Sequence, residues 1–184
     1  QNLIFPTPLS GMLSLADGEL LREQSRPTLT WAAGSNSSRI FVGHSGYPGA
    51  TLPTLTSMAA DSQERQQGLP GFEGAVTGIA LAADGNSLFV SLRERTTLKL
   101  LEVDPASLQV RDEILSEVVD SAWNPIDVDL QKGKLGPTHI VPSASGKLLL
   151  TYGMHADGTW QFRIWKRSGG SKDGSLWKKD DVVI

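Results

Sequence analysis

The chain has 184 residues, of which 39% are hydrophobic and 20% are charged, and its formal net charge is −3. These values are typical of a soluble globular protein with a sizeable core, and they exclude the collagenous, disordered and strongly basic classes, so nucleic acid is not expected as a direct ligand. The sequence contains no cysteine, which excludes disulfides and thiolate metal sites, and no apolar run approaches the ~20 residues of a membrane helix.

The first residues predict short strands and a tight turn. Leu3–Phe5 is an apolar triplet stopped by Pro6 and Pro8, which fits a short edge strand. The stretch GMLSLADGELLRE follows, with apolar residues on both sides of Asp17-Gly18. Asp-Gly between apolar runs predicts a hairpin, because the turn needs residues that tolerate a positive φ.

The start of the sequence also bears on its origin and compartment. It has neither an initiating Met nor the charged and apolar pattern of a signal peptide. We therefore expect either a processed N-terminus or an excerpt from a longer chain. Small secreted domains more often carry disulfides, so the lack of cysteine favours an intracellular protein of the cytoplasm or nucleus.

The chain is organised around residues 76–104, VTGIALAADGNSLFVSLRERTTLKLLEVD. An Asp84-Gly85 turn separates a first apolar run from Leu88-Phe89-Val90, and a second link leads to the apolar residues of 98–103. This pattern predicts three consecutive antiparallel strands.

Two further copies of this pattern can be aligned with it. Residues 28–44 align at an offset of 48, which places Trp31 on Ile79. Residues 138–167 align at an offset of 61, which places Ile140 on Ile79. In this third copy, QFRIWKR follows a loop that is three residues longer, so that Phe162 falls on Leu98. Three copies of one strand pattern indicate a repeat architecture with insertions between the copies.

The segments between the copies have different compositions. Residues 45–75 are rich in Gly, Pro and polar residues and are expected to form a surface insertion, in which only Met58–Gln67 could make a short helix. The link 105–137 predicts one strand through Leu108 and Val110, with a helix over Leu108–Val119 as the alternative, and a further strand through Ile126–Leu130.

These residues resemble a WD-repeat or WD-like β-propeller. The copies near 29–44, 76–104 and 138–167 correspond to propeller blades, and QFRIWKR is similar to the third strand of such a blade. The resemblance implies that residues 1–184 are a single all-β domain or a segment of a propeller, built as an array of four-stranded antiparallel blades. The Gly-His and Trp-Asp pairs of strict WD repeats are missing, so a degenerate WD propeller and a YVTN-type propeller both fit.

The number of copies bears on ring closure. Three copies with partial strands at each end make about three and a half blades, whereas propellers typically have four to eight. Either a fourth blade closes between the two ends of the chain, or the ring is completed by residues or by a chain not present here.

The resemblance implies a non-catalytic interaction scaffold without a cofactor, bound to other protein subunits in a larger assembly. Loops at the rim of the blades would supply the contacts. Arg93 and Arg95 belong to one such loop, and His155 and Trp160 to the matching loop of the third copy. Trp160 has two interpretations, as an exposed anchor for a partner or as a residue packed against a neighbouring blade. Charge reversal at Arg93 and Arg95 is expected to weaken partner capture without lowering thermal stability.

Two alternatives to the scaffold rest on other residues. Glu102 and Asp104 share one face of a strand, as do Asp127 and Asp129, which fits either a solvated face or a calcium or catalytic pair in a propeller lactonase or hydrolase. An exposed Trp160 would also suit a carbohydrate-binding propeller, because aromatic rings stack on sugars.

Overall fold

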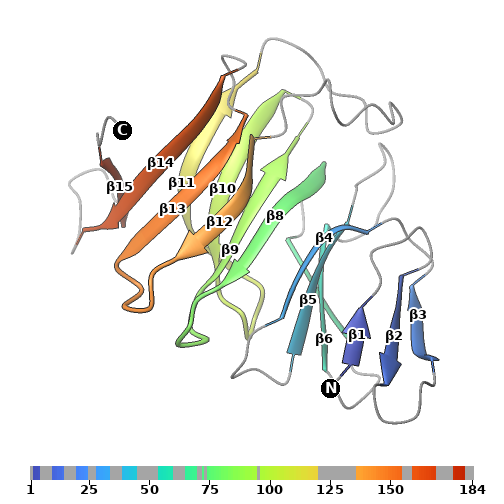
Figure 1. Ribbon diagram of the computed structural model, residues 1–184. Helices are drawn as coiled ribbons and strands as arrows, with labels where there is room; N and C mark the ends of the chain where they lie inside the picture. The colour runs from blue at the N-terminus through green and yellow to red at the C-terminus, as the bar shows by residue number, and fades with distance from the viewer. Residues whose placement is uncertain are drawn as a thin grey trace.

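The computed structural model describes residues 2–4, 10–14, 20–24, 28–33, 39–44, 54–59, 65–69, 72, 74–94, 96–119, 136–154, 159–168 and 176–180. These residues form strands and turns, arranged as four antiparallel sheets that fan out side by side (Figure 1). In the described part of the chain, no helix has the length and apolarity needed to cross a membrane.

Each sheet consists of strands that follow one another in the chain. Sheet I contains β1 (Asn2–Ile4), β2 (Ser10–Ser14) and β3 (Leu20–Gln24). Sheet II contains β4 (Thr28–Ala33), β5 (Arg39–His44), β6 (Leu55–Ala59) and β7 (Arg65–Gly68). Sheet III contains β8 (Ala75–Leu81), β9 (Leu88–Arg93), β10 (Thr97–Val103) and β11 (Val110–Val118). Sheet IV contains β12 (Gly136–Pro142), β13 (Leu148–Met154), β14 (Trp160–Arg167) and β15 (Trp177–Asp180).

The three predicted copies correspond to β4 and β5 of sheet II, to β8, β9 and β10 of sheet III, and to β12, β13 and β14 of sheet IV. Their strand registers agree in detail. The pairs Trp31–Val42, Ile79–Val90 and Ile140–Thr151 occupy the same place in the three sheets. Each first strand also carries a register shift at the same position, after Thr28, Val76 and Pro137 respectively. The offsets of 48 and 61 are therefore confirmed down to the position of this bulge, which adds local twist to the inner edge of each sheet.

The predicted turns are confirmed where the structure describes them. Gly85 has a φ of +74° and Gly146 a φ of +65°, the left-handed region that glycine enters without a steric penalty. The Gly85 amide donates to the Ala82 carbonyl at 2.9 Å, and the Asn86 amide donates to Asp84 Oδ1 at 3.0 Å. This backbone hydrogen bond from Asn86 is the main cause that holds the pKa of Asp84 below its usual value.

The third strand of the last copy lies two residues away from the predicted alignment. Trp160 pairs with Met154 at the start of β14, just as Leu98 pairs with Arg93 at the start of β10. Trp160, and not Phe162, is therefore the equivalent of Leu98. The prediction was wrong about the length of the loop, which is one residue longer than its counterpart, but a shift of two residues keeps every side chain on its predicted face.

The expected surface insertion over residues 45–75 was wrong, as was the short helix over Met58–Gln67. This segment supplies β6 and β7, which complete sheet II. All five residues of β6 are buried, because this strand lies between β5 and β7 with a neighbouring sheet on its face. The Gly and Pro residues that suggested a surface loop surround strands that are too short to show their periodicity.

The strand predicted through Val110 is confirmed as β11, so the helix over Leu108–Val119 was wrong. Leu108 itself lies in the turn before β11, with a φ of +57° and a fully buried side chain. Asp104 organises this turn, because its Oδ1 accepts the amides of Ala106 and Ser107 at 2.8 Å each. The Ser107 amide, followed by the Arg111 guanidinium, lowers the pKa of Asp104 to about 2. The strand predicted through Ile126–Leu130 lies outside the described residues.

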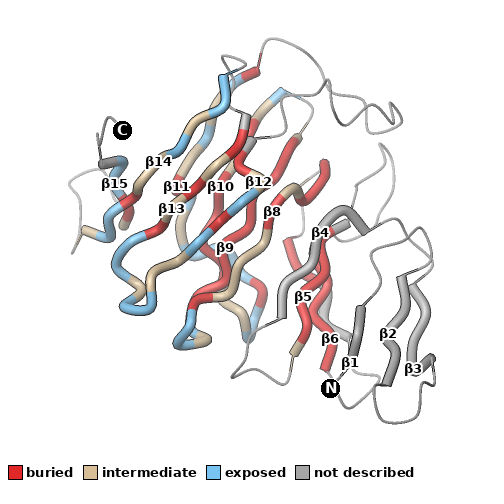
Figure 2. Tube along the Cα trace, viewed as in Figure 1, coloured by how far each residue is buried: buried red, intermediate tan, exposed pale blue. Residues whose placement is uncertain are grey.

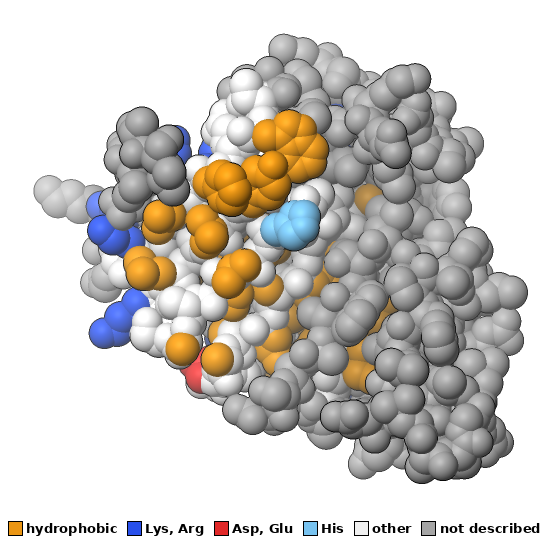
Figure 3. All heavy atoms as spheres, viewed as in Figure 1, with side chains coloured by type: hydrophobic (Ala, Val, Ile, Leu, Met, Phe, Trp, Pro, Cys, Tyr) orange, Lys and Arg blue, Asp and Glu red, His pale blue; other side chains and the backbone are white. Residues whose placement is uncertain are grey.

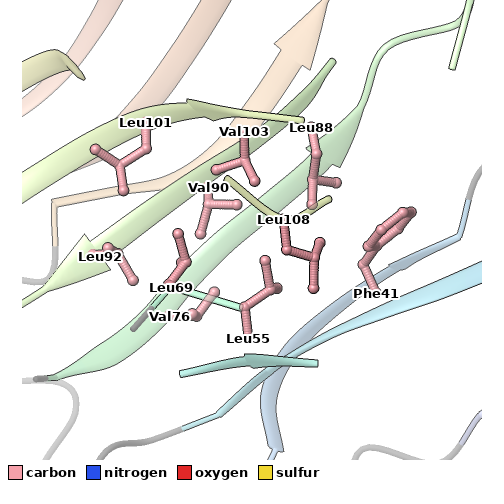
Figure 4. Packing of buried hydrophobic residues seen from close by; sticks show 10 residues of the cluster. All are labelled: Phe41, Leu55, Leu69, Val76, Leu88, Val90, Leu92, Leu101, Val103 and Leu108. Carbon is pink, nitrogen blue, oxygen red and sulfur yellow. The ribbon is translucent and has the colours of Figure 1, made fainter. Parts of the chain in front are cut away.

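Two apolar layers hold the middle of the fan together. Between sheets II and III, side chains of β5, β6, β8, β9 and β10 interlock with Leu69 and Leu108 from the connecting turns (Figure 4). Between sheets III and IV, a second cluster joins Phe89 and Leu100 to Leu149, Trp165 and neighbouring residues. Sheet III is therefore covered on both faces, as its mostly red strands β9 and β10 show in Figure 2.

Gly68→Ala tests how closely the turns pack against this core. A Cβ at Gly68 would lie 2.3 Å from the Leu108 Cβ, too close for either residue to accommodate. We expect a loss of about 2 kcal/mol in the free energy of unfolding, the usual size for overpacking, measured by urea denaturation. Gly85→Ala is the control, because its Cβ would meet nothing within 4 Å and only its positive φ would cost about 1 kcal/mol. Equal losses at the two glycines would contradict the predicted steric clash.

Candidate interaction surface

Sheet IV has one face against sheet III, and no other sheet of the described residues lies on its second face. Along β13, the buried residues Leu149 and Thr151 alternate with residues that are exposed or half-buried, and on β14 the buried Trp165 lies on the same side of the sheet as its partner Leu149. The apolar residues on the other side of β12, β13 and β14 are called here the open face, and they are Val141, Leu148, Leu150, Tyr152, Trp160, Phe162 and Ile164. The exposed Lys166, which pairs with Leu148, borders them.

The open face is apolar and contiguous. Val141, Leu150 and Ile164 lie opposite one another across three strands, and Tyr152 pairs with Phe162 in the next row. The exposed fractions are 57% for Val141, 55% for Trp160 and 59% for Phe162. Figure 3 shows hydrophobic side chains gathered on this side of the molecule, next to a pale blue histidine. Large contiguous apolar patches are uncommon on monomers and mark interaction sites.

Aromatic rings form the centre of the open face. Tyr152 stacks on Phe162 with ring centroids 4.2 Å apart and lies 5.3 Å from Trp160. His139 closes the row, with its ring 5.9 Å from that of Tyr152. The stacked rings stiffen one another, so this face presents a rigid surface whose side chains would lose little conformational freedom on binding.

The equivalent positions of sheet III are buried by sheet IV. From the strand registers, Leu150 corresponds to Phe89, Trp160 to Leu98 and Phe162 to Leu100. The sheet III residues at these positions are at most 1% exposed. The open face is therefore the same structural surface that, one sheet earlier, forms an interface between sheets.

A change in polarity accompanies this difference. In each covered sheet, two polar side chains on neighbouring strands are hydrogen-bonded at equivalent positions. In sheet II, Arg39 Nε lies 2.6 Å from Ser57 Oγ, and in sheet III, Ser87 Oγ lies 2.6 Å from Glu102 Oε1. The register assigns Leu148 and Ile164 to these positions in sheet IV. The open face thus carries an apolar pair where the two covered faces carry hydrogen-bonded polar pairs.

Glu102 occupies the centre of the interface between sheets III and IV. Its side chain is fully buried, so the predicted solvated face is wrong for this residue. Its Oε1 accepts from Ser87 at 2.6 Å and from Arg167 Nη2 at 3.0 Å, and its Oε2 accepts from Trp177 Nε1 at 2.7 Å. Since every donor is a side chain of this chain, the geometry assigns Glu102 to holding the sheets together. Asp127 and Asp129 lie outside the described residues.

The structure separates the four predicted contact residues. Arg93 is the last residue of β9 and is 1% exposed, so its placement in a rim loop was wrong. Its Nη1 donates to the Glu94 carbonyl at 2.7 Å and to the Thr97 carbonyl at 3.4 Å, and burial lowers its pKa. Trp160 begins β14, within a strand, and belongs to the open face. Arg95 and His155 lie outside the described residues.

The other members of the open face were not singled out from the sequence, although a signal was present. In β13 the run Leu148-Leu149-Leu150 is apolar at consecutive positions, which indicates a strand that is apolar on both faces. The same holds for Phe162, Ile164 and Trp165 in β14. In the part of the chain that the structure describes, one of the two apolar faces of sheet IV has no sheet against it. Within the described ranges, no group of three or more His, Asp or Glu side chains could hold a metal ion.

Comparison with known proteins supports the fold and gives no family. No family model matches the sequence, and no curated protein matches it. Among solved structures, the chain is similar to an oligogalacturonate lyase in complex with manganese (TM-score 0.61, 14% identity), with 94% of this chain and 41% of that chain covered. The chain is also similar to the β-propeller domain of Cps50 (Swd1) from Myceliophteria thermophila (TM-score 0.55, 16% identity). This alignment covers 92% of this chain and 49% of that chain.

A third similar structure is the Dos1 propeller (TM-score 0.55, 12% identity). The alignment with it covers 95% of this chain and 47% of that chain. The chain thus spans less than half the length of each of these three structures. At these identities the likeness shows the fold, which is an all-β propeller array of four-stranded antiparallel blades in an incomplete ring. Sheets II, III and IV are its blades, as predicted from the three copies.

Proposed function

We propose that this chain is a degenerate WD-like propeller subunit that serves as a non-catalytic, intracellular protein-interaction scaffold in a larger assembly. The open face of sheet IV is the observation that carries this proposal. It gathers exposed apolar and aromatic side chains on a rigid sheet, the composition that is enriched at the centres of protein interfaces. The propeller structures similar to this chain include an enzyme, the oligogalacturonate lyase, beside the Cps50 (Swd1) and Dos1 propellers, so the proposal rests on this surface and not on the comparison.

Trp160→Ala tests the scaffold. The tagged chain would be used to capture proteins from a native lysate, and the captured set would be quantified by mass spectrometry. We expect at least a tenfold loss of the captured partners, because removing a tryptophan anchor costs an interface about 2 kcal/mol or more. The melting temperature of the isolated variant should change little, since the Trp160 side chain is 55% exposed.

Val118→Ala provides the matched control. Val118 is also an exposed apolar residue, at 76%, but it lies on β11, the outer strand of sheet III, away from the open face. It should leave the captured set unchanged. If Trp160→Ala and Val118→Ala retain the same partners in the same amounts, the open face is not the scaffold's contact surface.

A carbohydrate-binding function is the second candidate, and the paired rings of Tyr152 and Trp160 favour it. Exposed aromatic rings stack on sugar faces, and these two rings have centroids 5.3 Å apart. Binding on a glycan array that disappears in Trp160→Ala would favour this candidate over protein capture.

A further inference from the structure

The junction between sheets III and IV shows how a covered face of this chain is matched by the surface that covers it. Its centre is the apolar cluster described above, and charged side chains pair across it. Arg167 Nη2 donates to Glu102 Oε1 at 3.0 Å, and Arg163 Nη1 donates to Glu117. In both pairs the acid belongs to sheet III and the cation to sheet IV. The covering surface is therefore also apolar, and it is opposite in charge.

The open face has cations at one end. Leu148, Lys166 and Lys178 lie opposite one another across β13, β14 and β15. Both lysines are exposed, and Figure 3 shows blue side chains at the left edge of the hydrophobic patch. One acidic residue, Asp180, falls in the register of this face, opposite Ile164. In the described part of the chain, the border of the open face is therefore mainly cationic.

Sheet III has an acid at the place of one of these lysines. Because Trp160 corresponds to Leu98, Lys166 corresponds to Asp104. Asp104 is used within its own sheet, where it accepts the amides of its turn and the Arg111 guanidinium. The sign of the charge is thus reversed from sheet III to sheet IV. By the rule of the observed junction, the surface that matches the open face carries acids near Lys166.

We propose that the open face binds a protein segment that is apolar at its centre and acidic at one end. The apolar side chains of the segment pack on Tyr152, Trp160 and Phe162, and its Asp or Glu side chains pair with Lys166 and Lys178. Phe162 and Lys166 are four residues apart on β14, or about 13 Å at the rise of a strand. About four residues of an extended segment or about nine of a helix span this distance. The inference rests on the proposed scaffold function, because it names the chemistry of the partner of the same surface.

A protein segment fits this face better than a single-stranded nucleic acid, the other class of ligand that brings both rings and negative charge. Aliphatic side chains surround the aromatic row, and they pack closely against apolar side chains but offer bases no ring on which to stack. These residues are Val141, Leu148, Leu150 and Ile164. A nucleic acid would also bring a phosphate with every nucleotide to a chain whose net charge is −3.

Peptide selection tests the chemistry of the ligand. A phage library of random peptides of about 16 residues would be selected on the immobilised chain and counter-selected on Trp160→Ala. We expect the enriched sequences to combine several aromatic or aliphatic residues with a cluster of Asp and Glu on one side of them. Enriched sequences without an excess of acid overturn the inference, as does the absence of any enriched sequence. A chain that binds a fluorescent oligothymidylate and no peptide overturns it in favour of nucleic acid.

A charge exchange tests the contact with the lysines. Fluorescence anisotropy would measure the binding of a labelled synthetic copy of the most enriched peptide. The double variant Lys166→Glu, Lys178→Glu should bind it about tenfold more weakly at low salt, because attraction becomes repulsion at two positions. A peptide in which Lys replaces the acids should bind the double variant better than the wild type. Equal affinity of the wild type and the double variant for the acidic peptide overturns the inference.

Lys179→Glu is the matched control. This residue is also exposed and lies on β15, but it pairs with the buried Trp165, so its side chain is on the other side of the strand from Lys178. The variant should bind the acidic peptide like the wild type. A loss as large as that of the double variant would mean that the peptide responds to the overall charge of the chain and does not contact the open face. Circular dichroism of each variant checks that the fold is kept.

The two proposals can fail separately. If no acidic peptide binds while Trp160→Ala still abolishes the capture of proteins from the lysate, the acidic segment is wrong and the scaffold stands. If acidic peptides bind the open face while Trp160→Ala and Val118→Ala capture the same proteins, the peptide site stands and the scaffold is wrong.

Discussion

Replacing Glu102 by alanine is expected to lower the free energy of unfolding by about 3 kcal/mol. The carboxylate is fully buried and accepts hydrogen bonds from Ser87, Arg167 and Trp177. Without it, the Ser87 hydroxyl and the Trp177 indole lose their acceptor in the interior, at roughly 1–3 kcal/mol for each buried group left unsatisfied. The Arg167 side chain is 37% exposed, so water recovers part of its loss. Urea denaturation followed by circular dichroism measures the change.

Two further variants separate the contributions to this effect. Trp177→Phe removes one donor and keeps most of the ring that packs edge-on against Phe89 at 5.5 Å, so it should cost about 1 kcal/mol. Glu102→Gln keeps the side-chain volume and one acceptor oxygen, so its loss in the free energy of unfolding should lie between those of Trp177→Phe and Glu102→Ala. A Glu102→Ala variant as stable as the wild type would mean that the carboxylate does not join sheets III and IV.

Arg93→Glu is expected to lower the free energy of unfolding by at least about 3 kcal/mol. The guanidinium is buried and donates to the carbonyls of Glu94 and Thr97, which lie at the two ends of the β9–β10 turn. A carboxylate in this place can donate to neither carbonyl and would be a buried charge facing carbonyl oxygens. The sequence predicted no loss of stability for this charge reversal, whereas burial predicts a severe one. Thermal and urea unfolding would measure it.

Arg93→Lys is the matched control for this position. It keeps a positive charge and a long apolar stem, but the ammonium group lacks the planar fork of the guanidinium, so a loss smaller than that of Arg93→Glu is expected. If the wild type and Arg93→Glu were equally stable, the Arg93 side chain would be accessible to solvent, as its predicted place in a rim loop requires.

The fold was predictable where the sequence repeats itself. Asp84-Gly85 and Ser145-Gly146 mark equivalent turns, and the apolar runs beside them fix both register and face. Strands without this pattern were missed. β6 and β7 are five and four residues long and follow a segment rich in Gly and Pro, so neither period nor length distinguished them from a loop. The predicted alignment of β14 with β10 was wrong by two residues. The length of the loop before β14 could not be read from the sequence, because several offsets between the two strands match apolar residues with apolar residues.

The candidate site was predictable only in part, and Trp160 shows why. Its exposure was one of two interpretations, and the choice between them depends on whether another sheet covers sheet IV, which no local pattern encodes. Arg93 failed for the opposite reason. A charged residue near a turn is usually solvated, but here the turn folds its carbonyls back onto the guanidinium. The buried Glu102 was hidden because its three donors come from residues 15, 65 and 75 positions away.

The order of strands within the sheets has a consequence for how the chain folds. Every sheet is made of consecutive strands, so each can form as soon as its own segment has left the ribosome, with only short loops to close. The donors to Glu102 from Arg167 and Trp177 arrive last, at the far end of the sequence. Until sheet IV has been synthesised, sheet III exposes both this carboxylate and the apolar surface around Phe89. During synthesis, each newly formed sheet therefore exposes one apolar face until the next sheet forms and covers it.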